Sequence, residues 1–76
     1  MRVDLVTRTD CHLCEEALAS LRAAGVRPRL LDVDADPLLL DLYGWRVPVV
    51  LLDGEVAAEG RVSVEAVLTA MGGRRP

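Results

Sequence analysis

The hydrophobic and polar positions divide the chain into seven short segments, each with the period of a strand or of a helix. β-Branched and apolar residues are frequent over residues 1–7 and again over residues 29–33, so both segments are predicted to be strands. We expect a helix between them, with Asp10 as its N-cap and Gly25 at its end. The apolar residues of this helix recur at helical spacing and form one stripe: Cys14, Ala17, Leu18 and Leu21.

A second helix and a third strand are predicted in the next part of the chain. Asp36 and Pro37 are typical of the N-cap and the first position of a helix, which we expect to end at Gly44. The apolar run at residues 48–52 is then predicted to be a strand. Because this run does not alternate with polar residues, we expect both faces of the strand to be covered.

A hairpin and a final helix complete the predicted elements. Asp53 and Gly54 favour a two-residue turn, so residues 55–58 are predicted to return antiparallel to the third strand. Ser63 is expected to cap the last helix. The apolar stripe of that helix consists of four residues at helical spacing: Val64, Val67, Leu68 and Met71.

These elements predict one small α/β domain with the order β-α-β-α-β-β-α. The first strand–helix–strand unit should form a right-handed crossover with parallel strands, whereas the hairpin requires antiparallel neighbours. A mixed four-stranded sheet flanked by helices on both faces satisfies both conditions. We expect the domain to span residues 1–73 and residues 74–76 to form a disordered tail.

The composition narrows the classes of protein to which the chain can belong. It has 76 residues, 51% of them hydrophobic, and a net charge of −3, so a disordered chain is excluded. The acidic balance argues against nucleic-acid binding, and no apolar stretch is long enough to span a membrane. The first residues lack the apolar block of a secretory signal, so we expect a cytoplasmic protein, which we take to be a monomer.

Aromatic and charged residues lead to further expectations about core and surface. Tyr43 and Trp45 are the only aromatic residues, and we expect both to close the core beneath the second helix; an exposed aromatic patch is the alternative. The charges of Arg2, Asp4 and Glu55 are expected at the surface. Four aspartates are expected to lie in solvent at the end of a strand and to cap a helix: Asp32, Asp34, Asp36 and Asp41.

The segment between the first strand and the first helix carries the candidate chemistry. Cys11 and Cys14 are three positions apart, which places both sulfur atoms on one face of a helical turn. Cys11 lies at the helix end, where unpaired backbone N–H groups stabilise a thiolate, and Cys14 begins the buried stripe. We therefore predict that Cys11 attacks a substrate disulfide and that Cys14 resolves the mixed disulfide. A C-x-x-C pair in a strand–helix–strand unit is the pattern of a thioredoxin-like redox site.

Two neighbours are expected to modulate the reactivity of Cys11. Asp10 disfavours an adjacent anion, whereas His12 favours the thiolate only when its imidazole is protonated. The predicted chemistry requires no bound cofactor and no metal, because electrons pass through the sulfur atoms themselves.

Over nearly its whole length, the sequence resembles the glutaredoxin-like branch of the thioredoxin-fold superfamily. The similar features are residues 9–14, residues 46–48, the Asp53-Gly54 turn and Gly60. The resemblance implies that the first cysteine of the motif is the nucleophile and that the second resolves. It also implies that the bond before Pro48 is cis, that Pro48 faces the cysteines, and that Val47 offers backbone hydrogen bonds to a bound thiol peptide.

The same resemblance makes glutathione a candidate reductant or substrate. Arg8 stands where the family has the basic residue of its glutathione site. Residues 60–63 differ from the family's Gly-Gly-x-Asp-like turn, and His12 and Leu13 replace the usual Pro and Tyr between the cysteines. The predicted partners are therefore protein disulfides or low-molecular-weight disulfides, together with a reductase or glutathione.

Two other functions stay open on the sequence alone. Two thiolates suit a soft ion such as Cu(I) or Zn(II), as in small metallochaperone domains. Those domains end on a strand, however, whereas residues 63–71 are predicted to be helical. The other alternative is a non-catalytic interaction domain that docks through an exposed patch of Tyr43 and Trp45.

Overall fold

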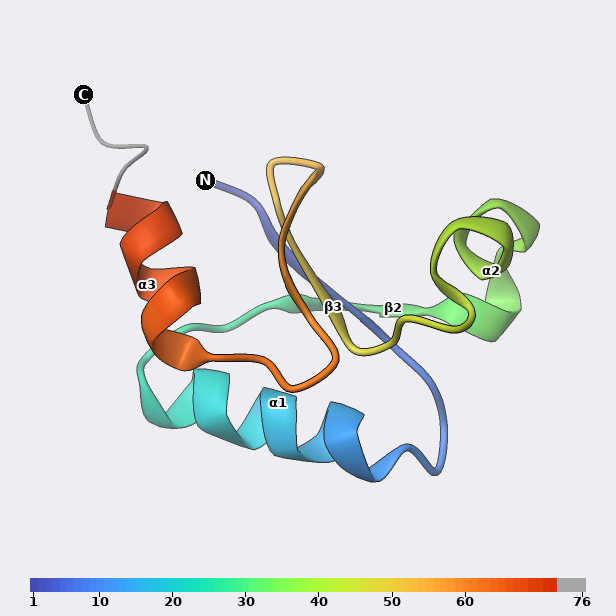
Figure 1. The fold of residues 1–76 in the computed structure, drawn as a ribbon, viewed down its shortest axis with the longest axis horizontal. Helices are drawn as coiled ribbons and strands as arrows, with labels where there is room; N and C mark the ends of the chain where they lie inside the picture. Colours follow the sequence, from blue (N-terminus) through green and yellow to red (C-terminus); the bar gives the residue numbers. More distant parts are fainter. Residues whose placement is uncertain (73–76) are drawn as a thin grey trace.

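The computed structural model describes residues 1–72, and its elements follow the predicted order (Figure 1). In chain order they are β1 (Val3–Thr7), α1 (His12–Ala23), β2 (Arg29–Asp32), the 3-10 helix η1 (Val33–Ala35), α2 (Pro37–Tyr43), β3 (Val49–Leu52), β4 (Glu55–Glu59) and α3 (Val64–Gly72). The 3-10 helix η1 is the element that the sequence pattern does not predict. It takes in Val33, which was expected to end the second strand.

The four strands form one mixed sheet in the order β2-β1-β3-β4. β1 and β2 are parallel, as the crossover through α1 requires, and β3 is antiparallel to both β1 and β4. The predicted α/β fold with a mixed four-stranded sheet is therefore confirmed. The register pairs Val6 with Val49, so the end of β1 that leads into α1 lies beside the start of β3.

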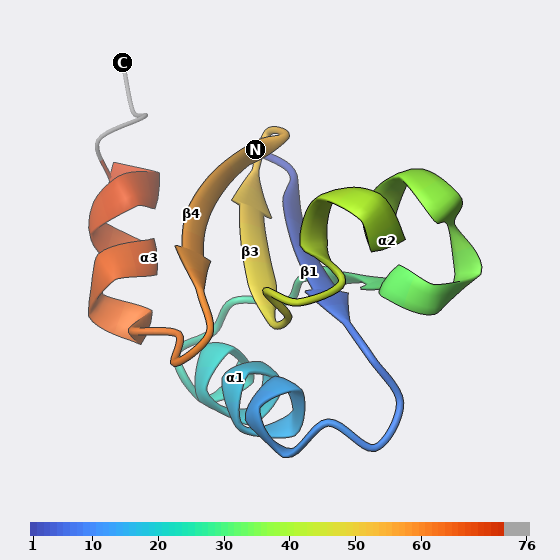
Figure 2. The same ribbon diagram turned by 45° about the vertical axis from the view of Figure 1, so that its right-hand side comes forward.

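Helices cover both faces of the sheet, and each face has its own core (Figure 2). The larger core lies between the sheet and the helices α1 and α3: Leu5, Ala17, Leu21, Val26, Val50, Leu52 and Val67. The smaller core lies on the face covered by η1 and α2: Val6, Val33, Val49 and Leu51. All four residues of β3 are buried because successive side chains of this strand enter opposite cores.

Two of the three predicted N-caps, Asp36 and Ser63, and the predicted hairpin turn are present. The carboxylate of Asp36 accepts a 2.9 Å hydrogen bond from the N–H of Leu38, and the hydroxyl of Ser63 accepts one of 3.2 Å from the N–H of Ala66. Asp53 and Gly54 have φ angles of 49° and 86°. Positive φ at both central residues is what a type I′ hairpin turn requires.

Asp4 is not at the surface, so that expectation is wrong. Its side chain lies on the central strand β1 and the residue is only 1% exposed. Arg29 on β2 is its partner in the register, and the Nε atom of Arg29 donates to the carboxylate at 2.9 Å. The Nε atom of Arg2 donates to the other carboxylate oxygen at 3.1 Å. The strand's alternation thus turns the carboxylate inward, and Arg29 of β2 and Arg2, which precedes β1, supply its hydrogen bonds.

The expectations for Trp45 and Leu68 are also wrong. Trp45 is fully exposed, whereas Tyr43 packs against the smaller core. Trp45 follows the end of α2, in a turn where helical spacing no longer directs side chains inward. In α3, Val67 is buried but the adjacent Leu68 is exposed, so the apolar stripe is narrower than predicted.

Two further expectations were that no stretch spans a membrane and that residues 74–76 form a tail. Within residues 1–72, no helix is both long and apolar enough to cross a membrane. Residue 73 and the tail expected at residues 74–76 lie outside the part of the chain that the structure describes.

Candidate redox site

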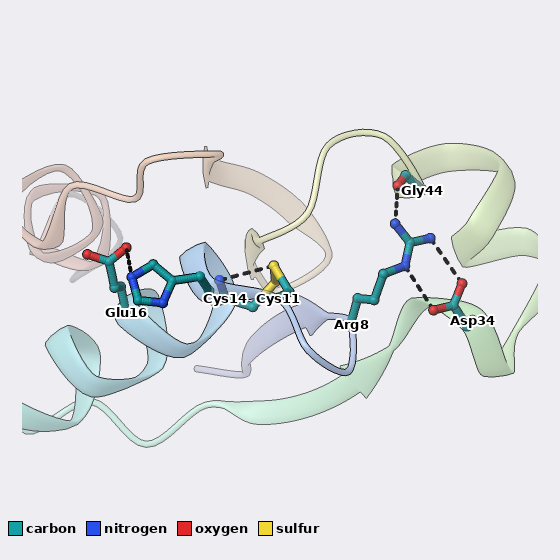
Figure 3. Close-up of a disulfide and its surroundings, with 7 residues drawn as sticks. Arg8, Cys11, Cys14, Glu16, Asp34 and Gly44 are labelled. Atoms are coloured by element: carbon teal, nitrogen blue, oxygen red, sulfur yellow. Dashed lines mark hydrogen bonds and ion pairs between the residues drawn. A yellow bond between two sulfur atoms is a disulfide. The ribbon is translucent and has the colours of Figure 1, made fainter.

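Cys11 and Cys14 lie at the N-terminal end of α1 and form a disulfide (Figure 3). Their Cα atoms are 5.2 Å apart. Cys11 is the N-cap of α1, and its Sγ atom accepts a 3.2 Å hydrogen bond from the backbone N–H of Cys14. The loop between β1 and α1 therefore places one sulfur atom at the positive end of the helix, where an orphan N–H is available.

Asp10 is not the N-cap of α1, which corrects the prediction from the sequence. It lies in the turn before the helix with a φ of 59°, a conformation that aspartate adopts more readily than most residues. The sulfur of Cys11, rather than the carboxylate of Asp10, is the acceptor at the helix terminus. The influence of Asp10 on the reactivity of Cys11 stays a prediction.

The two cysteines differ in their exposure to solvent. Cys11 is partly exposed, whereas Cys14 is 2% exposed and belongs to the buried face of α1. A substrate can therefore approach the sulfur of Cys11 more easily than that of Cys14. This difference in burial was predicted, and the chemical roles assigned to the two cysteines stay predictions.

His12 is directed along the surface of α1 toward Glu16. Its side chain is 86% exposed, and its Nε2 atom lies 3.5 Å from a carboxylate oxygen of Glu16, one helical turn away. An effect of His12 on the cysteines stays a prediction.

Arg8 lies at the end of β1 that leads to the cysteines, and all three of its guanidinium nitrogens are bonded (Figure 3). Two of them donate to the two carboxylate oxygens of Asp34, at 2.9 and 3.0 Å. The third donates to the backbone carbonyl of Gly44 at 2.9 Å. This arrangement joins β1, η1 and the end of α2 at one point beside the disulfide.

The paired side chains alter each other's protonation. The hydrogen bond from Arg8 lowers the pKa of the Asp34 carboxyl below its ordinary value, and the same bond raises the pKa of Arg8. Both groups are therefore charged at neutral pH. This ion pair was not predicted: Asp34 was expected among the aspartates that lie in solvent at the end of a strand and cap a helix. The two residues are 26 positions apart, and a local pattern carries no signal for such a pair.

Val47 and Pro48 lead into β3, and the peptide bond between them is cis. Pro48 is buried and Val47 is partly buried. The carbonyl of Pro48 accepts a 2.9 Å hydrogen bond from the N–H of Gly60, which has a φ of 68°. In Figures 1 and 2, the segment before β3 passes beside the N-terminal end of α1, as the pairing of β1 with β3 requires. Substrate binding by Val47 and Pro48 stays a prediction.

Hollows flank the disulfide on two sides. One, of about 130 Å³, lies between α1 and the segment before α3, and Leu13, Glu16 and Arg61 are among the residues that line it. The other, of about 280 Å³, is lined by Arg8, Leu40, Gly44 and Trp45. Within residues 1–72, no group of three or more His, Cys, Asp or Glu side chains is arranged to hold a metal ion.

Known proteins share both the sequence pattern and the fold. The family model described as a glutaredoxin-like domain (DUF836) matches residues 2–71. The crystal structure of the thioredoxin-like protein BC3987 is similar, with a TM-score of 0.68 and 29% sequence identity. The match covers 90% of this chain and 97% of that one. No curated protein sequence matches the chain.

Proposed function

The chain belongs to the glutaredoxin-like family of thioredoxin-fold proteins, and from that premise we propose that it is a thiol–disulfide oxidoreductase. The observation that carries this proposal is the Cys11–Cys14 disulfide at the start of α1, with one sulfur partly exposed and the other buried. A pair that forms a disulfide in this position can store and release two electrons without a bound cofactor.

In the proposed reaction, the thiolate of Cys11 attacks one sulfur of a substrate disulfide. A bond forms between Cys11 and that sulfur, and the other substrate sulfur leaves as a thiolate that takes up a proton. The thiol of Cys14 then loses its proton and attacks the Sγ atom of Cys11. This step releases the second substrate thiol and leaves the Cys11–Cys14 disulfide, so the substrate gains the two electrons that the dithiol loses.

The return to the dithiol requires two electrons from a thiol reductant. Two glutathione molecules or the dithiol of a reductase can supply them by the same exchange in reverse. We place this cycle in the cytoplasm, whose thiol pool keeps exposed cysteines reduced, and we propose that a monomer carries it out. Protein disulfides and small-molecule disulfides are both substrates by this chemistry.

The hydrogen bond at the helix terminus supports Cys11 as the attacking thiol. The N–H of Cys14 is directed at the sulfur of Cys11, and this donor stabilises a thiolate more than a neutral thiol. We propose that Val47 and Pro48 orient the substrate from the segment beside the cysteines, and that Arg8, Asp10 and His12 adjust the charge around them.

Disulfide reduction by single-cysteine variants tests the proposed function. Insulin and a mixed disulfide of glutathione with a small thiol serve as substrates, with excess glutathione as the electron source. We expect Cys11→Ser to abolish the reduction of both substrates. We expect Cys14→Ser to abolish the reduction of insulin but to retain that of the glutathione mixed disulfide, because free glutathione can replace the resolving thiol.

The matched control is Ala19→Ser, which adds a hydroxyl to an exposed position of the same helix. It should reduce both substrates at the rate of the unchanged protein. Activity that survives Cys11→Ser, or an unchanged protein that reduces neither substrate, contradicts the proposed function.

A further inference from the structure

The surface around Trp45 exposes large apolar side chains to solvent. Trp45 is the sole tryptophan of the chain and is fully exposed. Three leucines of α2 are also exposed: Leu38, Leu40 and Leu42. Of these leucines, Leu40 lines a hollow together with Trp45, and we call these two residues the Trp45 surface. Clusters of exposed apolar side chains of this kind, with an aromatic residue among them, are typical of contact sites for other proteins.

The Trp45 surface contains a hollow of about 280 Å³, bounded by Arg8, Leu40, Gly44 and Trp45. Pockets for whole small molecules usually measure about 300–1,000 Å³, so this hollow is suited to one large side chain. Two of the lining side chains are apolar, and Gly44 contributes no side chain of its own. An apolar side chain of a partner therefore fits the hollow better than a polar ligand.

The charges around the Trp45 surface are negative. Residues 30–45 contain four aspartates and no lysine, arginine or histidine. Asp36 is the N-cap of α2, and its carbonyl accepts from the N–H of Leu40; Asp41 is the exposed neighbour of Leu40 on the helix. Arg8, which lines the hollow, is paired with Asp34, and Arg46, which follows Trp45 in the chain, is paired with Glu59. A partner with lysine or arginine next to its apolar side chain is complementary to this surface.

The same charges disfavour glutathione at this side of the disulfide. Glutathione carries two carboxylates and one ammonium at neutral pH, so its net charge repels the aspartates. The guanidinium of Arg8 donates to Asp34 through two nitrogens and to the carbonyl of Gly44 through the third. These bonds occupy three of the five N–H donors of Arg8, and two of them are charge-assisted, so Arg8 has less capacity left for a glutathione carboxylate.

The hollow is close enough to the disulfide for one partner segment to reach both. Arg8 precedes Cys11 by three positions, so their Cα atoms are at most about 11 Å apart. Figure 3 shows Arg8, Asp34 and Gly44 on one side of the disulfide and Glu16 on the other. A partner segment that binds at Cys11 therefore needs only a few extended residues to reach toward the hollow.

Resting on the proposed function, we propose that the Trp45 surface docks the substrate of Cys11, and that this substrate is a protein disulfide. The partner segment has a large apolar side chain within a few residues of its cysteine, with lysine or arginine beside it. The apolar side chain fills the hollow next to Trp45, and the basic side chain lies against Asp36 and Asp41. The exchange at Cys11 then follows the two steps given above.

Peptide mixed disulfides with varied flanking residues test this specificity. Three peptides each carry one cysteine linked to the same small thiol. The two positions expected to contact the hollow and the aspartates are Leu and Lys in the first peptide, Leu and Glu in the second, and Gly and Lys in the third. The glutathione mixed disulfide with the same small thiol is the fourth substrate. We expect the highest kcat/KM for the peptide with Leu and Lys, by about tenfold over either other peptide at low salt. The preference for Lys over Glu should fall as salt is added.

Variants locate the preference on the Trp45 surface. Trp45→Ala should lower kcat/KM for the peptide with Leu and Lys by about tenfold relative to its effect on the glutathione substrate. Asp36→Asn combined with Asp41→Asn should remove the preference for Lys over Glu, and asparagine retains the helix cap. Leu68→Ala removes an exposed apolar side chain from α3 and is the matched control. Circular dichroism and the urea midpoint verify that each variant is folded.

The outcomes separate the docking surface from the proposed function. Equal kcat/KM for all three peptides, or an equal effect of Trp45→Ala on peptide and glutathione substrates, overturns the docking proposal while the oxidoreductase activity stands. Activity that does not depend on Cys11 overturns the proposed function itself.

Discussion

The two faces of the sheet are covered in different ways. On one face, α1 and α3 bury side chains in the larger core, and α1 begins at the disulfide. On the other face, α2 has no fully buried residue and three of its leucines are exposed. The first face therefore anchors the helix that carries the cysteines, whereas the second leaves apolar side chains of α2 exposed to solvent.

The largest expected difference is between a leucine of α1 and a leucine of α2. Leu21 is completely buried in the larger core, whereas Leu38 is 73% exposed. We expect Leu21→Ala to lower the free energy of unfolding by about 3 kcal/mol, because it removes buried contacts and leaves a cavity. Leu38→Ala should change it by less than about 0.5 kcal/mol. Urea unfolding followed by circular dichroism measures both, and equal losses would contradict this difference between the faces.

A smaller loss of stability is expected for a substitution of Asp4, which lies on the face of the sheet that α2 covers. Asp4 shares a side of β1 with Val6, the side that α2 covers, yet it is buried and bonded to Arg2 and Arg29. We expect Asp4→Asn to lower the free energy of unfolding by about 2 kcal/mol, since it removes one of the two charge-assisted hydrogen bonds and takes the charge from the other. Asp41→Asn, at an exposed position, is the control. A loss at Asp4 no larger than that of the control in urea unfolding would show that this carboxylate contributes little.

The smallest effect is expected at the ion pair beside the redox site, and it depends on pH. Because Arg8 lowers the pKa of Asp34, the pair stabilises the folded protein above the carboxyl's unfolded pKa, and this contribution is lost as the pH falls through the lowered value. The stability gap between the unchanged protein and Asp34→Asn should therefore be largest near neutral pH and should shrink below about pH 4. Urea midpoints between pH 7 and pH 3 measure the gap. A gap that is constant or that widens on acidification would contradict the assignment.

The elements and the cysteine pair could be predicted because their signals are local. The turn at Asp53 and Gly54, the caps at Asp36 and Ser63, and the apolar run of β3 each depend on a few adjacent residues. The order of these elements then leaves few sheet topologies that satisfy the right-handed crossover. The fold therefore followed from the sequence, apart from the short helix η1.

The contacts around the site could not be predicted because they join distant segments. Asp4 is buried only because β2 brings Arg29 beside it, and Asp34 meets Arg8 across 26 positions. The exposure of Trp45 depends on where α2 ends relative to the smaller core. Asp10 failed as a cap because the sulfur of Cys11 occupies that role, and cap preferences derived from oxygen acceptors do not include it.

The full exposure of Trp45 has a practical consequence for measurements on this protein. It is the sole indole of the chain, and its ring lies in water beside the redox site rather than in the core. Its fluorescence should therefore emit at the long wavelengths of a hydrated indole, and any molecule that covers the ring should shift the emission to shorter wavelengths. The unlabelled protein thus carries its own optical reporter, and titration against candidate partners can be followed without a dye.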